Sequence, residues 1–230
     1  MIMKAAVLIA ASGRGLRMGG DIKKQYLTLA GRPVLARSLQ VFISHPAVQQ
    51  IVVIVPKNEI DLARETIKPF CALGKICFVE GGRRRQDSIY QGLLAISGDV
   101  AMVCIHDGVR PLVSSELFES VLEAACRYGA AIPVVPVTDT LKEVSFSGMV
   151  GRTIPRETIR RAQTPQIFRH ELISEAYRKA HILGVEATDD AYLLELVGET
   201  VYTVPGSPSN IKITSPQDLL FAEALLKGGR

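Results

Sequence analysis

The chain has 230 residues, of which 47% are hydrophobic, and a formal net charge of +4. This length and composition allow a sizeable hydrophobic core and favour one domain over residues 1–230. The net charge is small and no basic stripe is interleaved with aromatic residues, which argues against nucleic-acid binding, and no apolar run approaches the length of a membrane span.

Short apolar runs alternate with segments of helical period through the first 137 residues. The predicted strands span residues 5–10, 50–55, 76–79, 101–105 and 130–137. The helices between them carry apolar residues three or four positions apart; the first should begin near Pro33, and Ser114 or Ser115 should cap the helix that contains Leu117. Continuously apolar strands that alternate with helices predict an α/β fold with a Rossmann-like, mostly parallel sheet and helices on both faces.

The alternation breaks at about residues 138–163, where apolar and polar residues alternate on both sides of Ser147 and Gly148. This pattern predicts a β-hairpin arm that projects from the domain. A two-stranded hairpin is marginally stable alone, so we expect it to pack on another surface, which a second copy of the chain would supply. Helices at 170–183 and 189–197, a strand at 201–204 and a helix at 216–226 should complete the fold.

The four cysteines have neither C-x-x-C spacing nor a histidine at metal-ligand spacing. We therefore expect free thiols and a reducing compartment. The N-terminal residues lead into a strand without a charged leader and apolar core, so a cytoplasmic location is expected.

The loop after the first strand is long and rich in glycine and positive charge. Its four cations are Arg14, Arg17, Lys23 and Lys24. Glycines let backbone N–H groups approach a ligand, so we expect a polyanion here, with a nucleoside triphosphate favoured over a merely solvated loop. The dinucleotide motif fails at Met18, and the P-loop motif fails because Asp21 follows Gly20.

Two further clusters follow predicted strands. The run from Gly81 to Ser88 opens a helix, and its glycines would let the backbone approach a flat base; Arg85 and Ser88 are the candidate contacts. Asp107 ends the strand at 101–105 and would suit Mg²⁺, a hard cation that takes oxygen ligands together with substrate phosphates. A helix N-cap is the alternative role for Asp107, and His106 is expected to be structural.

A fourth cluster is spread along the second half of the chain. Hydroxyl groups and two cations would form a second anion site there, at Thr140, Arg156, Thr164, Thr188 and Lys212. A helix N-cap is the competing role for Thr188.

These motifs occur in a fixed order, A-A-x-G-x-G-x-R-M, K-Q-Y, G-G-x-x-R-x-x-S, H-D-x-x-R-P, D-T-L-K, T-P-Q, T-D-D-A and N-I-K-I-T. The ordered set resembles the 2-C-methyl-D-erythritol 4-phosphate cytidylyltransferase family over about residues 4–226. The first motif alone would indicate only the wider sugar nucleotidyltransferase superfamily. The resemblance therefore implies the nucleotidyltransferase fold.

The resemblance implies that the chain binds CTP and Mg²⁺ or another hard divalent cation. It implies that Arg17 and Lys24 stabilise the pentavalent transition state at the α-phosphate and that Asp107 helps to hold the metal ion. The residues expected to bind the nucleotide, or to shape the loop around it, are Ala10, Ala11, Gly13, Gly15, Gly82, Arg85 and Ser88.

The resemblance also implies a sugar-alcohol phosphate acceptor, which Arg156 and Lys212 would position; we count both with Arg17 and Lys24 as catalytic. Further substrate contacts are expected at Arg110, Thr140, Thr164 and Thr188. The family is homodimeric, with an arm that crosses to the partner's active site. Thr140 and Arg156 are therefore expected to act on the partner's substrate.

The expected reaction transfers a cytidylyl group from CTP to 2-C-methyl-D-erythritol 4-phosphate and releases pyrophosphate. The nucleophile is a phosphate oxygen that is already anionic, so positioning and charge neutralisation suffice without a general base. Two alternatives stay open: a cytidylyltransferase that uses ribitol 5-phosphate, and a regulatory module that binds a nucleotide without turnover.

Overall fold

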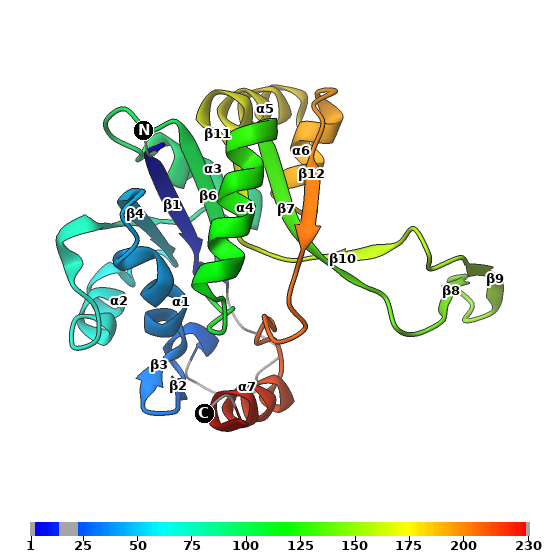
Figure 1. Cartoon of the computed structure of the whole chain (residues 1–230), viewed down its shortest axis with the longest axis horizontal. Coiled ribbons are helices and arrows are strands. Elements are labelled where there is room, and N and C mark those ends of the chain that lie inside the picture. Colours follow the sequence, from blue (N-terminus) through cyan, green and yellow to red (C-terminus); the bar gives the residue numbers. More distant parts are fainter. Residues whose placement is uncertain (1–2, 14–22, 229–230) are drawn as a thin grey trace.

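The protein is described by a computed structural model that covers residues 3–13 and 23–228. An eight-stranded mixed sheet forms its centre, in the order β10-β7-β11-β6-β1-β4-β5, with β12 also paired to β7 (Figure 1). The strands are β1 (Ala5–Ala10), β4 (Val48–Val55), β5 (Ile76–Glu80), β6 (Met102–Asp107), β7 (Ala130–Pro136), β10 (Arg160–Ala162), β11 (Gln166–Arg169) and β12 (Tyr202–Pro205).

Most strands of the sheet run in one direction. β1 is parallel to β4 and β6, and β4 is parallel to β5. β11 is antiparallel to both β6 and β7, so those two strands share a direction although they are not adjacent. The predicted mostly parallel α/β fold is therefore confirmed.

Helices cover both faces of the sheet, as the apolar strands predict. The helices are α1 (Val34–Ile43), α2 (Ile60–Ile67), α3 (Arg85–Leu94), α4 (Ser115–Tyr128), α5 (His170–Leu183), α6 (Asp190–Leu196) and α7 (Pro216–Gly228). Successive residues of a strand point to opposite faces. Val7 and Ile9 of β1 accordingly join one core cluster with α1, α2 and α4, while Leu8 joins a second cluster with α3, α5 and α6.

Several local expectations are confirmed and others need adjustment. Ser114 caps α4, because its Oγ accepts a hydrogen bond from the Leu117 N–H at 3.2 Å. A small hairpin of β2 (Thr28–Leu29) and β3 (Arg32–Pro33) precedes α1, so Pro33 lies just before the first helical residue. Two short strands, β10 and β11, were not predicted; β10 lies inside the stretch assigned to the arm but pairs with β7 of the main sheet.

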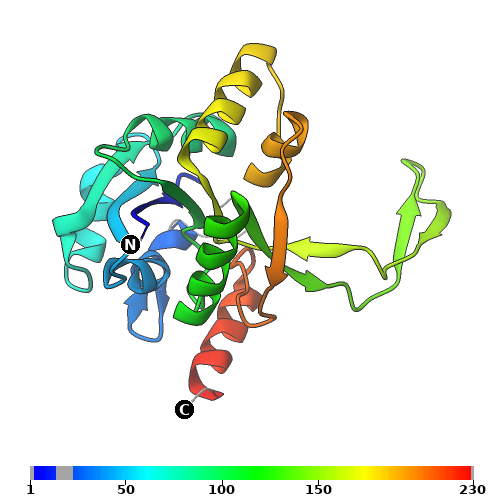
Figure 2. The ribbon, with the colours of Figure 1, turned by 45° about the horizontal axis from the view of Figure 1, so that its top comes forward.

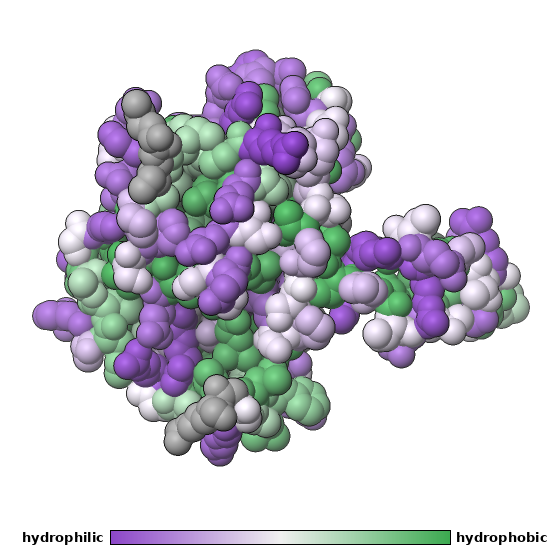
Figure 3. Space-filling model, in the orientation of Figure 1, coloured by the Kyte–Doolittle hydropathy of each residue, from purple (hydrophilic) through white to green (hydrophobic). Residues whose placement is uncertain are grey.

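The arm is a separate two-stranded hairpin of β8 (Leu141–Val144) and β9 (Val150–Ile154). It turns at Gly148, whose φ of 82° suits a residue without a side chain. Figures 1 and 2 show that it projects from the body of the protein in both views. Its tip carries exposed apolar side chains at Val144, Phe146, Met149 and Val150, mixed with polar ones in the space-filling view (Figure 3).

Two expectations about chemistry can be compared with the structure. All four cysteines are free, and Cys104 is fully buried in β6. Among the residues that the structure describes, no helix combines the length and the apolar composition needed to cross a bilayer.

Candidate active site

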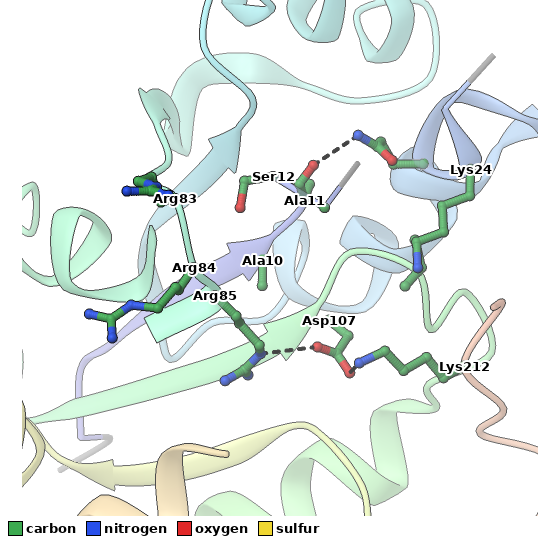
Figure 4. Close-up of a pocket in the computed structure, with 13 residues that line it drawn as sticks. Ala10, Ala11, Ser12, Lys24, Arg83, Arg84, Arg85, Asp107 and Lys212 are labelled. Atoms are coloured by element: carbon green, nitrogen blue, oxygen red, sulfur yellow. Dashed lines mark hydrogen bonds and ion pairs between the residues drawn. The ribbon is translucent and has the colours of Figure 1, made fainter. Parts of the chain in front are cut away.

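A pocket of about 210 Å³ opens at the carboxyl ends of the central parallel strands (Figure 4). In open α/β sheets this edge is where ligands bind, because loops and helix N-termini meet there. The lining residues come from the end of β1, the short 3-10 helix η2 (Lys24–Tyr26), the turn before α3, the end of β6 and the segment before α7. They are Ala10, Ala11, Ser12, Gly13, Lys24, Gln25, Gly82, Arg83, Arg84, Arg85, Asp107, Val109 and Lys212.

Asp107 is the one carboxylate among these lining residues, and three cations surround it. Its Oδ2 lies 2.9 Å from Lys212 Nζ and 3.3 Å from Arg110 Nε, and its Oδ1 lies 3.6 Å from Arg85 Nε. Burial alone would raise the pKa of Asp107, but Lys212, Arg85 and Arg110 outweigh it and hold the pKa well below its ordinary value. The carboxylate is therefore ionised at neutral pH, in a pocket with net positive charge.

Arg85 is held from behind by an acid that the sequence did not single out as a site residue. Its Nη1 and Nη2 donate to the two carboxylate oxygens of Asp190 at 3.0 and 2.6 Å. Asp190 is fully buried at the start of α6 and also accepts a hydrogen bond of 2.6 Å from the Tyr177 hydroxyl. The planar guanidinium of Arg85 thus connects Asp190 to Asp107, and its orientation is set by the bidentate pair.

The turn before α3 has room for glycine only. A Cβ on Gly82 would lie 2.4 Å from the Cβ of Asp87, and one on Gly81 would lie 2.6 Å from the Cβ of Ser12. Asp87 closes the turn, because its carboxylate accepts a hydrogen bond from the Arg84 N–H at 3.2 Å. The glycines therefore bring the backbone of this turn close to the end of β1, where it forms a wall of the pocket.

Ser88 lies behind that wall rather than in the lining. It is nearly fully buried, accepts a hydrogen bond from Ser12 Oγ at 2.8 Å and donates one to the Arg84 carbonyl at 2.9 Å. Its contacts in this structure therefore join the turn to the loop after β1. A contact with a base stays a prediction.

Thr164 and Arg110 support Asp107 from inside the protein. The Asp107 N–H donates to Thr164 Oγ1 at 3.1 Å, and the same hydroxyl lies 3.0 Å from Nδ1 of His106. Arg110 Nη1 donates to the Asn210 carbonyl at 2.7 Å, which links β6 to the segment that carries Lys212. His106 is fully buried, and burial lowers its pKa to about 4, as expected for a structural histidine.

The other predicted residues divide into two groups. Arg17 and Gly15 lie outside the described residues. Thr140, Arg156 and Thr188 are exposed, and the described lining of the pocket does not include them. Arg156 donates to the Thr138 carbonyl on the arm, and Asp189, not Thr188, caps α6 by accepting from the Tyr192 N–H at 3.0 Å.

The donor set was compared with what a metal ion needs. Among the described residues no group of three or more histidine, cysteine, aspartate or glutamate side chains could hold a metal ion. Asp107 is a single ionised carboxylate that faces the pocket. This set fits Mg²⁺ bound by one carboxylate together with substrate phosphates, and it does not fit an ion held by protein ligands alone.

Solved structures have the same fold over nearly the whole chain. The 2-C-methyl-D-erythritol 4-phosphate cytidylyltransferase from Thermus thermophilus has a TM-score of 0.81 and 38% identity, covering 98% of this chain and 100% of that one. The 4-diphosphocytidyl-2C-methyl-D-erythritol synthase from Anaerococcus prevotii has a TM-score of 0.85 and 32% identity, covering 98% and 96%. Fold and site together define an α/β nucleotidyltransferase.

The sequence comparisons identify the family. The model of the IspD family, 2-C-methyl-D-erythritol 4-phosphate cytidylyltransferase, matches residues 5–228. A protein with that name from Pelotomaculum thermopropionicum is 46% identical over 225 residues, which cover 97% of this chain and 94% of the relative. The chain belongs to the 2-C-methyl-D-erythritol 4-phosphate cytidylyltransferase family and is an enzyme of the cytidylyltransferase class.

Proposed function

We propose that this enzyme transfers a cytidylyl group from CTP to 2-C-methyl-D-erythritol 4-phosphate in the non-mevalonate route to isoprenoid precursors. The products are 4-diphosphocytidyl-2-C-methyl-D-erythritol and pyrophosphate. The observation that carries the proposal is the set of cations around one ionised carboxylate at the carboxyl ends of the strands, in a chain of this family. Such a set suits a reaction in which two phosphate-bearing substrates must meet.

The proposed chemistry depends on positioning and electrostatics. The acceptor phosphate oxygen attacks the α-phosphorus of CTP, the bond to the bridging oxygen breaks, and pyrophosphate leaves with the electron pair. Lys24 and Arg17 would neutralise the charge that grows on the α-phosphate, and Lys212 would attract the acceptor phosphate. No proton has to leave the attacking oxygen, so the absence of a general base from the proposed set is consistent.

Mg²⁺ is part of the proposal, with Asp107 as its ligand from the protein. When bound, the ion would neutralise phosphate charge and orient the phosphates. Asp107 is suited to this role because it is ionised and faces the pocket. Lys212 shares its Oδ2 and would be available to the acceptor phosphate once the ion takes part of that charge.

The proposed active unit is a homodimer in which each arm reaches the partner's pocket. The arm projects from its own body, its apolar tip is exposed, and it carries Thr140 and Arg156. Apolar side chains of this number on a projecting hairpin support a second protein surface as their contact. A cytoplasmic location completes the proposal and is supported by four free thiols.

The decisive experiment is a product assay with CTP and either 2-C-methyl-D-erythritol 4-phosphate or ribitol 5-phosphate. We expect pyrophosphate and the cytidylyl product with the first acceptor and little with the second. Preference for ribitol 5-phosphate would change the acceptor, whereas CTP binding without pyrophosphate release would favour a regulatory module.

Mixed dimers test the arm. Subunits with Lys24→Ala and subunits with Arg156→Ala should each be inactive, and mixing them should restore activity because one of the two hybrid sites contains both wild-type residues. Arg152→Ala serves as the matched control, since Arg152 lies on the same hairpin and pairs with Glu143 at 2.5 Å. Verified mixed dimers without recovery would contradict exchange of the arms.

A further inference from the structure

We propose that Glu59, at the start of α2 and outside the pocket lining, is a positioning residue that holds Lys24 in its place in the active site. This inference rests on the proposed function, because it assigns a role to Lys24. It adds a residue that no motif of the sequence indicated.

The carboxylate of Glu59 binds both residues that flank the pair Lys24 and Gln25. Its Oε1 forms an ion pair with Lys23 Nζ, and its Oε2 accepts a hydrogen bond from the Tyr26 hydroxyl at 3.1 Å. The Glu59 side chain is only 18% exposed, so these interactions are partly shielded from water and salt. One acid therefore fixes the segment on both sides of Lys24.

Gln25 is fixed from the opposite direction. Its Nε2 donates to the Ala11 carbonyl at 2.9 Å, and its side chain is buried. Lys23 and Tyr26 thus face α2 while Gln25 faces the end of β1. Between these anchors Lys24 extends toward the space bordered by Asp107 and Lys212 (Figure 4).

The short helix η2 needs anchors from elsewhere. It has three residues, and its N-cap residue, Lys23, makes no capping hydrogen bond with its side chain. A single 3-10 turn has poor hydrogen-bond geometry and does not set its own orientation. The partners that set it must therefore come from rigid parts of the fold.

Glu59 is such a partner because the start of α2 is itself fixed to the sheet. The Glu59 N–H donates to the Pro56 carbonyl at 3.1 Å, directly after β4, and the Asn58 N–H donates to Glu80 Oε1 at 3.0 Å. Ala63 and Ile67 then pack α2 into the core. The position of Lys24 is thereby referred to β4 and β5, two strands of the central sheet.

The hydroxyl of Tyr26 stays a donor at all physiological pH values. Burial and the adjacent Glu59 carboxylate raise the pKa of Tyr26 well above its ordinary value. The interaction with Glu59 is therefore a hydrogen bond to a charged acceptor, which is among the stronger kinds.

The test is a double-mutant cycle in the full-length enzyme with CTP and 2-C-methyl-D-erythritol 4-phosphate. Glu59→Gln should lower kcat by about tenfold with little change in the KM for CTP, because a small displacement of a transition-state contact affects mainly the chemical step. In the Lys24→Ala background the same substitution should have almost no further effect. Glu65→Gln, on the exposed face of the same helix, is the matched control.

Tyr26→Phe removes one contact of Glu59 and keeps the ring, so it tests the inference even where Glu59→Gln folds poorly; it should also lower kcat. Two results would overturn the inference: wild-type kcat in both variants, or an equal loss of kcat from Glu59→Gln with and without Lys24, which would show action on another part of the loop. A wild-type enzyme that releases no pyrophosphate would instead refute the proposed function.

Discussion

Replacing Asp190 by asparagine tests whether the buried acid behind the pocket stabilises the fold and orients Arg85. The substitution keeps the size of the side chain but removes its charge. It also places an amide that can donate where the guanidinium now donates at 2.6 and 3.0 Å. Arg85 would then keep only Asp107, at 3.6 Å.

The magnitude follows from the burial of the pair. Removing one partner of a buried ion pair costs about 3–5 kcal/mol. The Arg85 side chain is 31% exposed and retains Asp107, so the lower part of that range is reduced further, to about 2–3 kcal/mol. For a chain of this length the midpoint of thermal unfolding should fall by about 4–12 °C.

Activity should change in a related way. Arg85 without Asp190 is expected to move toward Asp107 and to compete for its carboxylate, so the KM for CTP should rise several-fold. Calorimetry and steady-state kinetics measure the two effects. Glu175→Gln, which affects an exposed pair with Arg178, should change neither. A midpoint within about 1 °C of the wild type would refute the reasoning, because it would mean that the pair adds nothing to stability.

Three further predictions concern the support of the pocket. Burial lowers the pKa of His106 from 6.5 to about 4, so between these values the unfolded chain binds a proton that the folded chain does not. The free energy of unfolding should therefore fall by about 3 kcal/mol from about pH 7 to about pH 4, in urea titrations with EDTA, and His106→Gln should flatten that slope; an unchanged slope would exclude His106 as its source. Thr164→Val should lower the free energy of unfolding by about 1–3 kcal/mol, because it leaves the buried Asp107 N–H without its acceptor, and Thr164→Ser should retain most of it. Gly82→Ala should weaken CTP binding, measured by calorimetry, because its Cβ would clash with Asp87, whereas Gly74→Ala has open space and should bind CTP normally; equal affinities would contradict a tight turn.

Much of the fold could be predicted because its signals are local. Buried parallel strands are apolar throughout, and the predicted strand at 5–10 matches β1 while the predicted helix at 170–183 matches α5. β11 was missed because only four residues form it, and its place between β6 and β7 is set by long-range pairing. A short run such as Gln166–Arg169 has no periodicity that could reveal such a partner.

The site was predictable where side chains follow a strand end directly. Lys24, Asp107 and Lys212 were all named from such positions, and the pocket brings them together. Asp190 was not, because an acid before an apolar helix is an ordinary capping residue by sequence. Only the packing of α5 and α6 on α3 brings Asp190 to Arg85, and no spacing in the chain encodes that contact.

The projecting arm makes the amount of protein a variable of catalysis under the proposed exchange. A single folded chain already builds the pocket that holds Lys24, Asp107 and Lys212. Thr140 and Arg156 lie on the arm and would complete a site only after a second chain arrives. On dilution, turnover per chain would decline while affinity for CTP would not. Nucleotide occupancy and flux would then respond to different quantities, the first to CTP alone and the second also to how much enzyme is present.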